Sequence, residues 1–193
     1  MPVDIDIKEW LKGKVSGERY EHLLGSEIEA KELAKRFNAD VNKAALAALI
    51  HDSAKSLSNA ELIKIIEENN IEVSEMEIKS RKPLHAPVSA FIAKAELGIT
   101  DQEILDAIRY HTIGRVNMSL LEKIVFLADK IEPNTRDKSF KAKIDKVLDR
   151  TNNIDEALLI CYDVTIRSLL DRKLIIDPET INVWNSLINS IQR

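Results

Sequence analysis

The chain is poor in the residues that build linkers and disulfide frameworks. Of its 193 residues, five are glycine, five are proline and one, Cys161, is cysteine. So few glycines and prolines leave no linker or low-complexity stretch that would separate two domains. A lone cysteine cannot form an internal disulfide, and its apolar neighbours in "ALLICYDVTI" predict a buried, unreactive thiol. This cysteine usage fits a reducing cytoplasm.

Two further absences limit the partners of the protein. No apolar run approaches the length of a membrane span, and the N-terminal "MPVDIDIKEW" has no basic stretch followed by an apolar one. Acidic residues outnumber basic ones, and the formal net charge is −4. Broad binding to nucleic acid or to a membrane surface needs a basic excess that displaces counterions. We therefore expect a soluble, cytoplasmic protein in which a few local cations or a metal hold any anionic ligand.

Apolar residues recur at helical spacing along nearly the whole chain. They do so in "EIEAKELAKRF" and in "EALLICYDVTIRSLL", and no sustained alternation of period two is present. The sequence therefore predicts an all-α protein of roughly nine or ten short helices. With 45% hydrophobic residues, the chain is long enough to bury one substantial core.

Local signals mark several helix ends. Three pairs match the capping box of a helix start: Ser58–Glu61, Thr100–Glu103 and Ser119–Glu122. Gly98 is placed to end a helix that begins near His85, and Pro133 to stop the helix of "EKIVFLADKI". Asp177 and Pro178 match the cap and first turn of the last helix.

Four histidines and two aspartates occur within or at the ends of predicted helices. They are His22 in "ERYEHLLGSEIEA", His51 and Asp52 in "NKAALAALIHDSAK", His85 in "HAPVSAFIAKAELG", His111 in "DQEILDAIRYH" and Asp129 in "SLLEKIVFLADKIEP". A single buried histidine is more often a hydrogen-bonded core residue than a ligand. Together, however, imidazole and carboxylate donors suit iron, manganese, cobalt or zinc, and packed helices can bring them to one point.

The order of these six residues resembles the HD-domain superfamily of metal-dependent phosphohydrolases. More closely, the chain resembles the bacterial symmetrical diadenosine tetraphosphate hydrolases of the YqeK type. The matching segments are "HDSAK", "LHAPVSA", "YHTIGRVNMSLLEKIVFLADKIEPNTR" and "TINVWNSL". The resemblance implies a compact multi-helix HD-domain fold, with residues 1–193 as a single domain. Its metal-site core would span about 16–135, and C-terminal helices at about 139–193 would pack on it.

The resemblance also implies a metal site. Its first-metal ligands would be His22, His51, Asp52 and Asp129, with iron as the expected metal and manganese or cobalt as alternatives. His85 and His111 would either bind a second ion or contact the substrate phosphate directly. The sequence leaves both the number of ions and the role of these two histidines open.

The implied activity is symmetrical hydrolysis of diadenosine tetraphosphate to two ADP. A divalent metal lowers the pKa of bound water from 15.7 towards about 7, which gives hydroxide at neutral pH. Asp52 would take part in catalysis, and Lys55 would supply a cation beside it. The expected substrate contacts are His85, His111, Thr112, Gly114, Arg115 and Arg136. A homodimer is a further implication, while hydrolysis of another nucleotide and metal-dependent nucleotide sensing without hydrolysis remain alternative functions.

Overall fold

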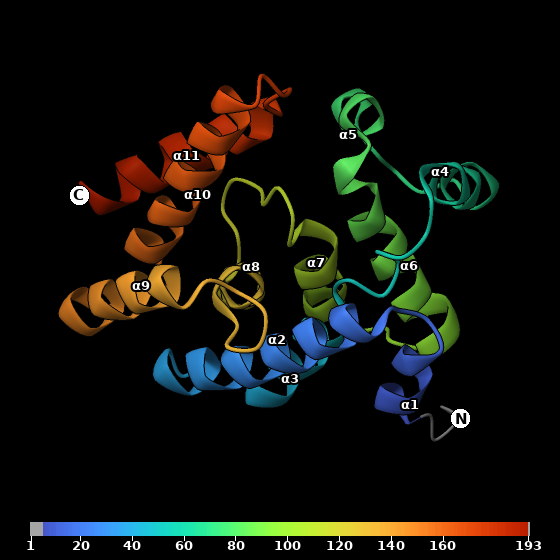
Figure 1. Cartoon of the computed structure of the whole chain (residues 1–193), viewed down its shortest axis with the longest axis horizontal. Helices are drawn as coiled ribbons and strands as arrows, with labels where there is room; N and C mark the ends of the chain where they lie inside the picture. The colour runs from blue at the N-terminus through green and yellow to red at the C-terminus, as the bar shows by residue number, and fades with distance from the viewer. Residues whose placement is uncertain (1–5, 193) are drawn as a thin grey trace.

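The computed structural model describes residues 6–192, which form eleven α-helices, one 3-10 helix and no strand (Figure 1). The predicted all-α class is confirmed, and the first five residues and the last one of the predicted domain lie outside the described residues. In chain order the elements are α1 (Ile7–Lys12), α2 (Gly17–Arg36), α3 (Val41–Ile50), α4 (Asn59–Glu68), α5 (Glu75–Ser80), η1 (Lys82–Leu84), α6 (His85–Leu97), α7 (Gln102–Tyr110), α8 (Leu120–Ile131), α9 (Lys138–Thr151), α10 (Ile154–Asp171) and α11 (Pro178–Ile191). The count exceeds the expected nine or ten because α1 and α5 have only six residues each, too few to show a clear apolar period.

Side-chain caps begin most of these helices. Ser58 and Ser119 form the predicted capping boxes of α4 and α8, and Ser74 forms a third one at α5 that the sequence analysis did not identify. The predicted cap at Thr100 is wrong. Asp101 caps α7 instead, because its carboxylate accepts a hydrogen bond at 3.0 Å from the amide of Glu103.

The predicted helix ends agree with the structure. Gly98 follows α6 in the left-handed conformation, with φ of 66°. Helix α8 ends at Ile131, two residues before Pro133, and Asp177 caps α11 with Pro178 in its first turn. These helix boundaries determine the positions of the polar residues that lie at or next to the helix ends.

Helix α8 lies in the middle of the molecule (Figure 1). It packs against α2, α3 and α7 and also against α9 and α10, while α11 covers α10. The largest apolar core is built from these helices and includes the buried Cys161, as predicted. A smaller core under α4 and α6 contains Leu62, Leu84 and Val88. None of the helices within residues 6–192 is long and apolar enough to cross a membrane.

The loop between α7 and α8 is anchored to α10 through one tyrosine. The hydroxyl of Tyr162 donates a hydrogen bond at 2.7 Å to the carbonyl of Ile113, and its ring stacks on Phe126 with 5.0 Å between ring centres. Gly114 lies directly under this hydroxyl with φ of 82°. A Cβ at Gly114 would overlap the Tyr162 oxygen, so both the backbone conformation and the packing require glycine.

Replacing Gly114 with alanine should therefore lower the free energy of unfolding more than the same change at Gly98. Both residues have positive φ, but a Cβ at Gly98 meets no neighbouring atom. Strain alone should cost about 1–2 kcal/mol at Gly98, and overpacking against Tyr162 should add about 1–3 kcal/mol at Gly114. Urea denaturation of the two variants measures the difference. Equal losses would show that the contact with Tyr162 contributes nothing.

Candidate metal centre

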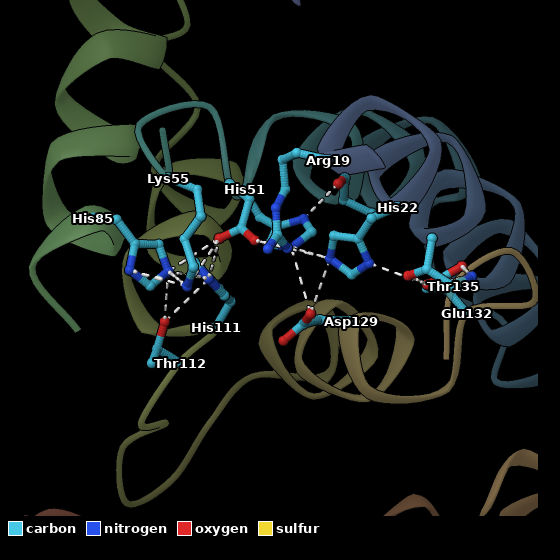
Figure 2. A network of polar contacts seen from close by, with 12 residues as sticks. Arg19, His22, His51, Lys55, His85, His111, Thr112, Asp129, Glu132 and Thr135 are labelled. Atoms are coloured by element: carbon cyan, nitrogen blue, oxygen red, sulfur yellow. Dashed lines mark hydrogen bonds and ion pairs between the residues drawn. The ribbon is translucent and has the colours of Figure 1, made fainter. Parts of the chain in front are cut away.

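Four histidines and two aspartates meet in one buried cluster (Figure 2). His22 lies on the second turn of α2, His51 and Asp52 follow α3, His85 begins α6, His111 follows α7 and Asp129 lies in the last turn of α8. All six are at most 5% exposed. The structure therefore brings together every residue that the sequence analysis expected to bind metal.

The first group of donors contains His22, His51 and Asp129, whose ligand atoms lie within 4.8 Å of one another. The Oδ1 of Asp129 is 3.1 Å from the Nε2 of His22 and 3.7 Å from the Nε2 of His51. On the other side of the same nitrogens is the Oδ2 of Asp52, at 3.8 Å from His22 and 3.7 Å from His51. Two imidazoles and two carboxylates thus face a common point.

The second group lies around the other oxygen of the same aspartate. The Oδ1 of Asp52 is 3.0 Å from the Nε2 of His85 and 3.2 Å from the Nε2 of His111. His111, Asp52 and His51 also offer one ligand atom each, and these three atoms lie within 4.8 Å of one another. Asp52 therefore lies between the two groups and offers one oxygen to each.

Hydrogen bonds to the backbone orient three of the four imidazoles. In each, Nδ1 faces the carbonyl oxygen of the residue three positions earlier in the chain. The pairs are His51 with Ala48 at 2.6 Å, His85 with Lys82 at 2.8 Å and His111 with Ile108 at 2.7 Å. Because a carbonyl oxygen only accepts, Nδ1 carries the hydrogen, and Nε2 is the ring nitrogen that is left to bind a metal. This is the arrangement in which histidines bind metals in proteins.

The Nε2 lone pairs are directed at one another. The two Nε2 atoms of His22 and His51 are 3.3 Å apart, and those of His85 and His111 are 3.2 Å apart. Between His85 and His111, whose pKa values are both lowered by burial, two neutral rings cannot share a hydrogen bond, because the hydrogen of each ring is on Nδ1. The Oδ1 of Asp52 is also buried without a hydrogen-bond partner among the described residues. A divalent cation would satisfy these donors, so the cluster fits a metal.

Burial and neighbouring groups shift the pKa values of Asp52, His111 and His85 towards the protonation state that binds metal. Burial alone would raise the pKa of Asp52, but the surrounding imidazoles of His51, His111 and His85 hold it well below its usual value. Burial lowers the pKa of His111 to about 3 and also lowers that of His85. The carboxylate is therefore charged and these two imidazoles are neutral at pH 7, which is the state that ligands must have to bind a metal.

Glu132 orients the fourth imidazole and was missed by the sequence analysis. Its Oε1 is 3.1 Å from the Nδ1 of His22, and the carboxylate also accepts hydrogen bonds from the amides of Asn134 and Thr135. The side chain is fully buried, and Gly25 leaves room for it because a Cβ there would overlap Oε2. In the sequence, Glu132 stands directly before the proline that ends α8 and gives no further signal.

Basic side chains pair with both carboxylates of the cluster. Arg19 donates at 2.8 Å to the Oδ2 of Asp52, and Arg136 donates at 2.6 Å to the Oδ1 of Asp129. Lys130 bonds to the other oxygen of Asp129. Arg19 and Lys130 were not predicted, although Arg19 precedes His22 by three residues and so shares its helix face.

Lys55 lies near Asp52, as the sequence analysis expected, and it is beside the second group. Its Nζ is 2.9 Å from the Nε2 of His85 and 3.9 Å from the Oδ1 of Asp52. Burial lowers the pKa of this lysine, although Asp52 and Asp129 oppose the shift. Thr112 is close by, with its hydroxyl 3.0 Å from the Nε2 of His111. Both side chains could contact a ligand bound beside the cluster.

The cluster opens into a cleft of about 670 Å³. The volume is in the range of sites that bind small molecules. Its polar lining includes Asp52, Asp129, His111 and Thr112 and six basic residues: Arg19, Lys55, Lys79, Lys82, Lys130 and Arg136. A ligand in this cleft can therefore reach the cluster and many cations at once.

Two predicted substrate contacts lie elsewhere. Arg115 donates hydrogen bonds to Glu122 and, at 2.8 Å, to Asp106, and Gly114 packs under Tyr162. Both residues line a neighbouring cavity of about 300 Å³ and are absent from the lining of the cleft. The turn at Gly114 carries the chain away from the cluster directly after Thr112. Arg136, by contrast, lines the cleft as expected.

Comparison with known proteins agrees with this site. A family model described as "HD domain" matches residues 19–134, which contain all six residues of the cluster. The chain belongs to the HD-domain family.

Relatives within this family extend the similarity to nearly the whole chain. Two similar proteins are named "Bis(5'-nucleosyl)-tetraphosphatase, symmetrical". The one from Halalkalibacterium halodurans is 38% identical to this chain, and the alignment covers 92% of this chain and 93% of that protein. The one from Bacillus subtilis is 36% identical, and the alignment covers 93% of this chain and 94% of that protein. A crystal structure from Clostridium acetobutylicum, described as a predicted HD superfamily hydrolase involved in NAD metabolism, is 36% identical. The two structures superpose with a TM-score of 0.89, and the superposition covers 95% of this chain and 96% of the chain in the crystal structure.

Replacing Asp52 with asparagine should remove most of the bound metal. Asp52 offers one oxygen to each donor group, and an amide cannot supply the negative charge that compensates a divalent cation at both. Elemental analysis of the purified protein measures the effect. Asp171→Asn, at the exposed end of α10, is the matched control. Full metal content in a folded Asp52→Asn protein would contradict the assignment of Asp52 as a ligand.

Replacing Glu132 with glutamine should weaken metal binding by about 10- to 100-fold, because the residue orients a ligand without touching the metal. A glutamine side chain has one oxygen and one NH₂ group in place of two oxygens. The NH₂ group would either face the backbone donors of Asn134 and Thr135 or take the place of the oxygen that accepts from His22. Titration with Mn²⁺ against a chelating dye measures the affinity. Glu122→Gln is the control, since Glu122 is equally buried but bonds to Arg115 instead. Equal affinities in the two variants would remove the positioning role.

Proposed function

We propose that this protein hydrolyses diadenosine tetraphosphate symmetrically and releases two molecules of ADP. The observation that carries the proposal is a single cleft in which a buried histidine and aspartate cluster lies among six basic side chains. The chain as a whole is acidic, with a net charge of −4, so this gathering of cations is local. Support also comes from relatives named for this activity, which align over 92% and 93% of the chain.

The proposed ligands of a first ion are His22, His51, Asp52 and Asp129. His85 and His111 face a second position, which Asp52 reaches with its other oxygen. Nitrogen and carboxylate donors without thiolate suit iron, which we propose as the native metal, with manganese or cobalt as substitutes. Such a metal, when bound, is a Lewis acid that acidifies water and polarises a phosphoryl oxygen.

The cluster is arranged as a catalytic site would be. A structural metal site closes its coordination shell with protein ligands, whereas a catalytic one stays accessible to water and substrate. Here Asp52, His111 and Asp129 line an open cleft. This accessibility supports hydrolysis over a purely structural metal.

The basic residues of the cleft would hold the phosphates. Cleavage of a polyphosphate expels a phosphate leaving group that is already good, so the enzyme must mainly position the chain and neutralise its charge. Arg19 and Arg136 flank the first group, and Lys55 lies beside the second. We propose that Lys55 neutralises the charge on the departing phosphate and that the Thr112 hydroxyl donates to a phosphate oxygen.

Two wider properties are proposed on indirect grounds. The family resemblance implies a homodimer, and the exposed apolar side chain of Val164 on α10 is available for such an interface. The single, buried cysteine supports a cytoplasmic location, which we propose for this protein.

Incubation of the purified protein with diadenosine tetraphosphate should yield ADP as the only nucleotide product. A chelator should stop the reaction, and Fe²⁺, Mn²⁺ or Co²⁺ should restore it. Anion-exchange chromatography resolves ADP from AMP and ATP, and Asp52→Asn is the inactive control. Mononucleotides and NAD should be tested as substrates in the same assay, because the similar crystal structure is described as a hydrolase involved in NAD metabolism.

Each other result has a distinct meaning. AMP together with ATP would contradict symmetrical cleavage but leave a phosphohydrolase. Faster hydrolysis of another nucleotide would reassign the substrate. Saturable binding with no product in the metal-loaded protein would favour a sensor.

A further inference from the structure

The cleft has an apolar side that the metal cluster and the cations do not use. Leu169, Leu174 and Ile175 line the same cleft as the cluster, and we call these three residues the apolar shelf. Leu174 is 43% exposed and Ile175 is 50% exposed. Large apolar side chains that gather in a cleft and remain open to solvent mark a surface that binds a ligand.

The shelf is preformed by the way α10 ends. The amide of Leu174 donates at 2.9 Å to the carbonyl of Leu169, and the amide of Lys173 donates at 3.0 Å to that of Leu170. Lys173 is in the left-handed conformation, with φ of 52°. This pair of bonds is the Schellman motif, which places the residue after the left-handed one beside the residue five positions earlier. Leu174 and Leu169 are thus brought together by the backbone itself.

The shelf and two of the basic residues of the cleft come from different parts of the fold. The shelf belongs to α10 and the turn that leads to α11, whereas Lys79 and Lys82 belong to α5 and η1, and Figure 1 shows α5 apart from α10 and α11. Asp177 and Thr180, at the start of α11, border the shelf with a carboxylate and a hydroxyl. A ligand that fills the cleft would therefore meet both cations and aliphatic carbons.

We propose that the apolar shelf binds a purine base of the nucleotide whose phosphates lie on the cations and the cluster. This inference rests on the proposed function and names the part of the substrate that this function leaves unplaced. A purine base has two flat faces of low polarity, and the ribose connects the base to the phosphates. Such a base can pack against aliphatic side chains in the same cleft as the residues that bind the phosphates.

Replacing Leu174 or Ile175 with serine tests the shelf. The protein is loaded with Mn²⁺, and its affinity is measured by calorimetry for two probes, ADP and inorganic tripolyphosphate. Each variant should bind ADP roughly five- to tenfold more weakly, since each removes apolar contact area from the base. Affinity for tripolyphosphate, which has no base, should be unchanged. The KM for diadenosine tetraphosphate should rise while kcat stays the same.

Leu170→Ser is the matched control. Leu170 is 60% exposed at the same end of α10 but does not line the cleft, so both affinities should equal those of the parent protein. Ile175 lies outside the two bonds of the Schellman motif, so its variant tests the shelf even if Leu174→Ser disturbs the turn.

The outcomes separate the shelf from the proposed function. Unchanged ADP affinity in both shelf variants would overturn the shelf, as would an equal loss for tripolyphosphate or an equal loss in Leu170→Ser. Shelf-dependent ADP binding by a protein that cleaves no diadenosine tetraphosphate would support the shelf and contradict the hydrolase.

Discussion

The geometry of the cluster depends on hydrogen bonds between imidazole Nδ1 atoms and backbone carbonyls. A helix leaves its last carbonyls without amide partners, and His51 and His111 stand directly after α3 and α7, where their rings take over that role. The same bond satisfies the backbone and directs Nε2 towards the cluster. His85 achieves this at the 3-10 turn before α6, and His22, inside a helix with no free carbonyl, uses Glu132 instead. Helix ends thus explain where the histidines occur in the sequence.

Much of the fold could be predicted from the sequence because helix signals are local. The period of the apolar residues, the capping boxes at Ser58 and Ser119 and the glycine at Gly98 act within one or two turns. The cap at Thr100 was mispredicted because a hydroxyl and a carboxylate stand side by side and either can cap. The residues of the cluster could be named for a different reason, since few histidines are present and the order of all four along the chain resembles one family.

The surroundings of the cluster were harder to predict because they depend on distant contacts. Glu132 reaches His22 across 110 residues, and Arg19 reaches Asp52 across 33. Arg115 was expected at the substrate, but the positive φ of Gly114 and the hydroxyl of Tyr162 turn its segment towards Glu122. The apolar shelf gives no sequence signal, because exposed leucines at the end of an amphipathic helix resemble the edge of its buried face.

The position of Asp129 relative to His22 has a consequence for the stability of the whole chain. The two residues lie on α2 and α8, at the beginning and end of the segment that contains all the other donors, and their ligand atoms are 3.1 Å apart. To bind a cation with both residues, the unfolded chain would have to close a loop of roughly one hundred residues, which is entropically costly. Because the donors converge only in the folded chain, binding energy becomes folding energy. Metal supply would then govern how much folded protein a cell maintains as well as how active it is.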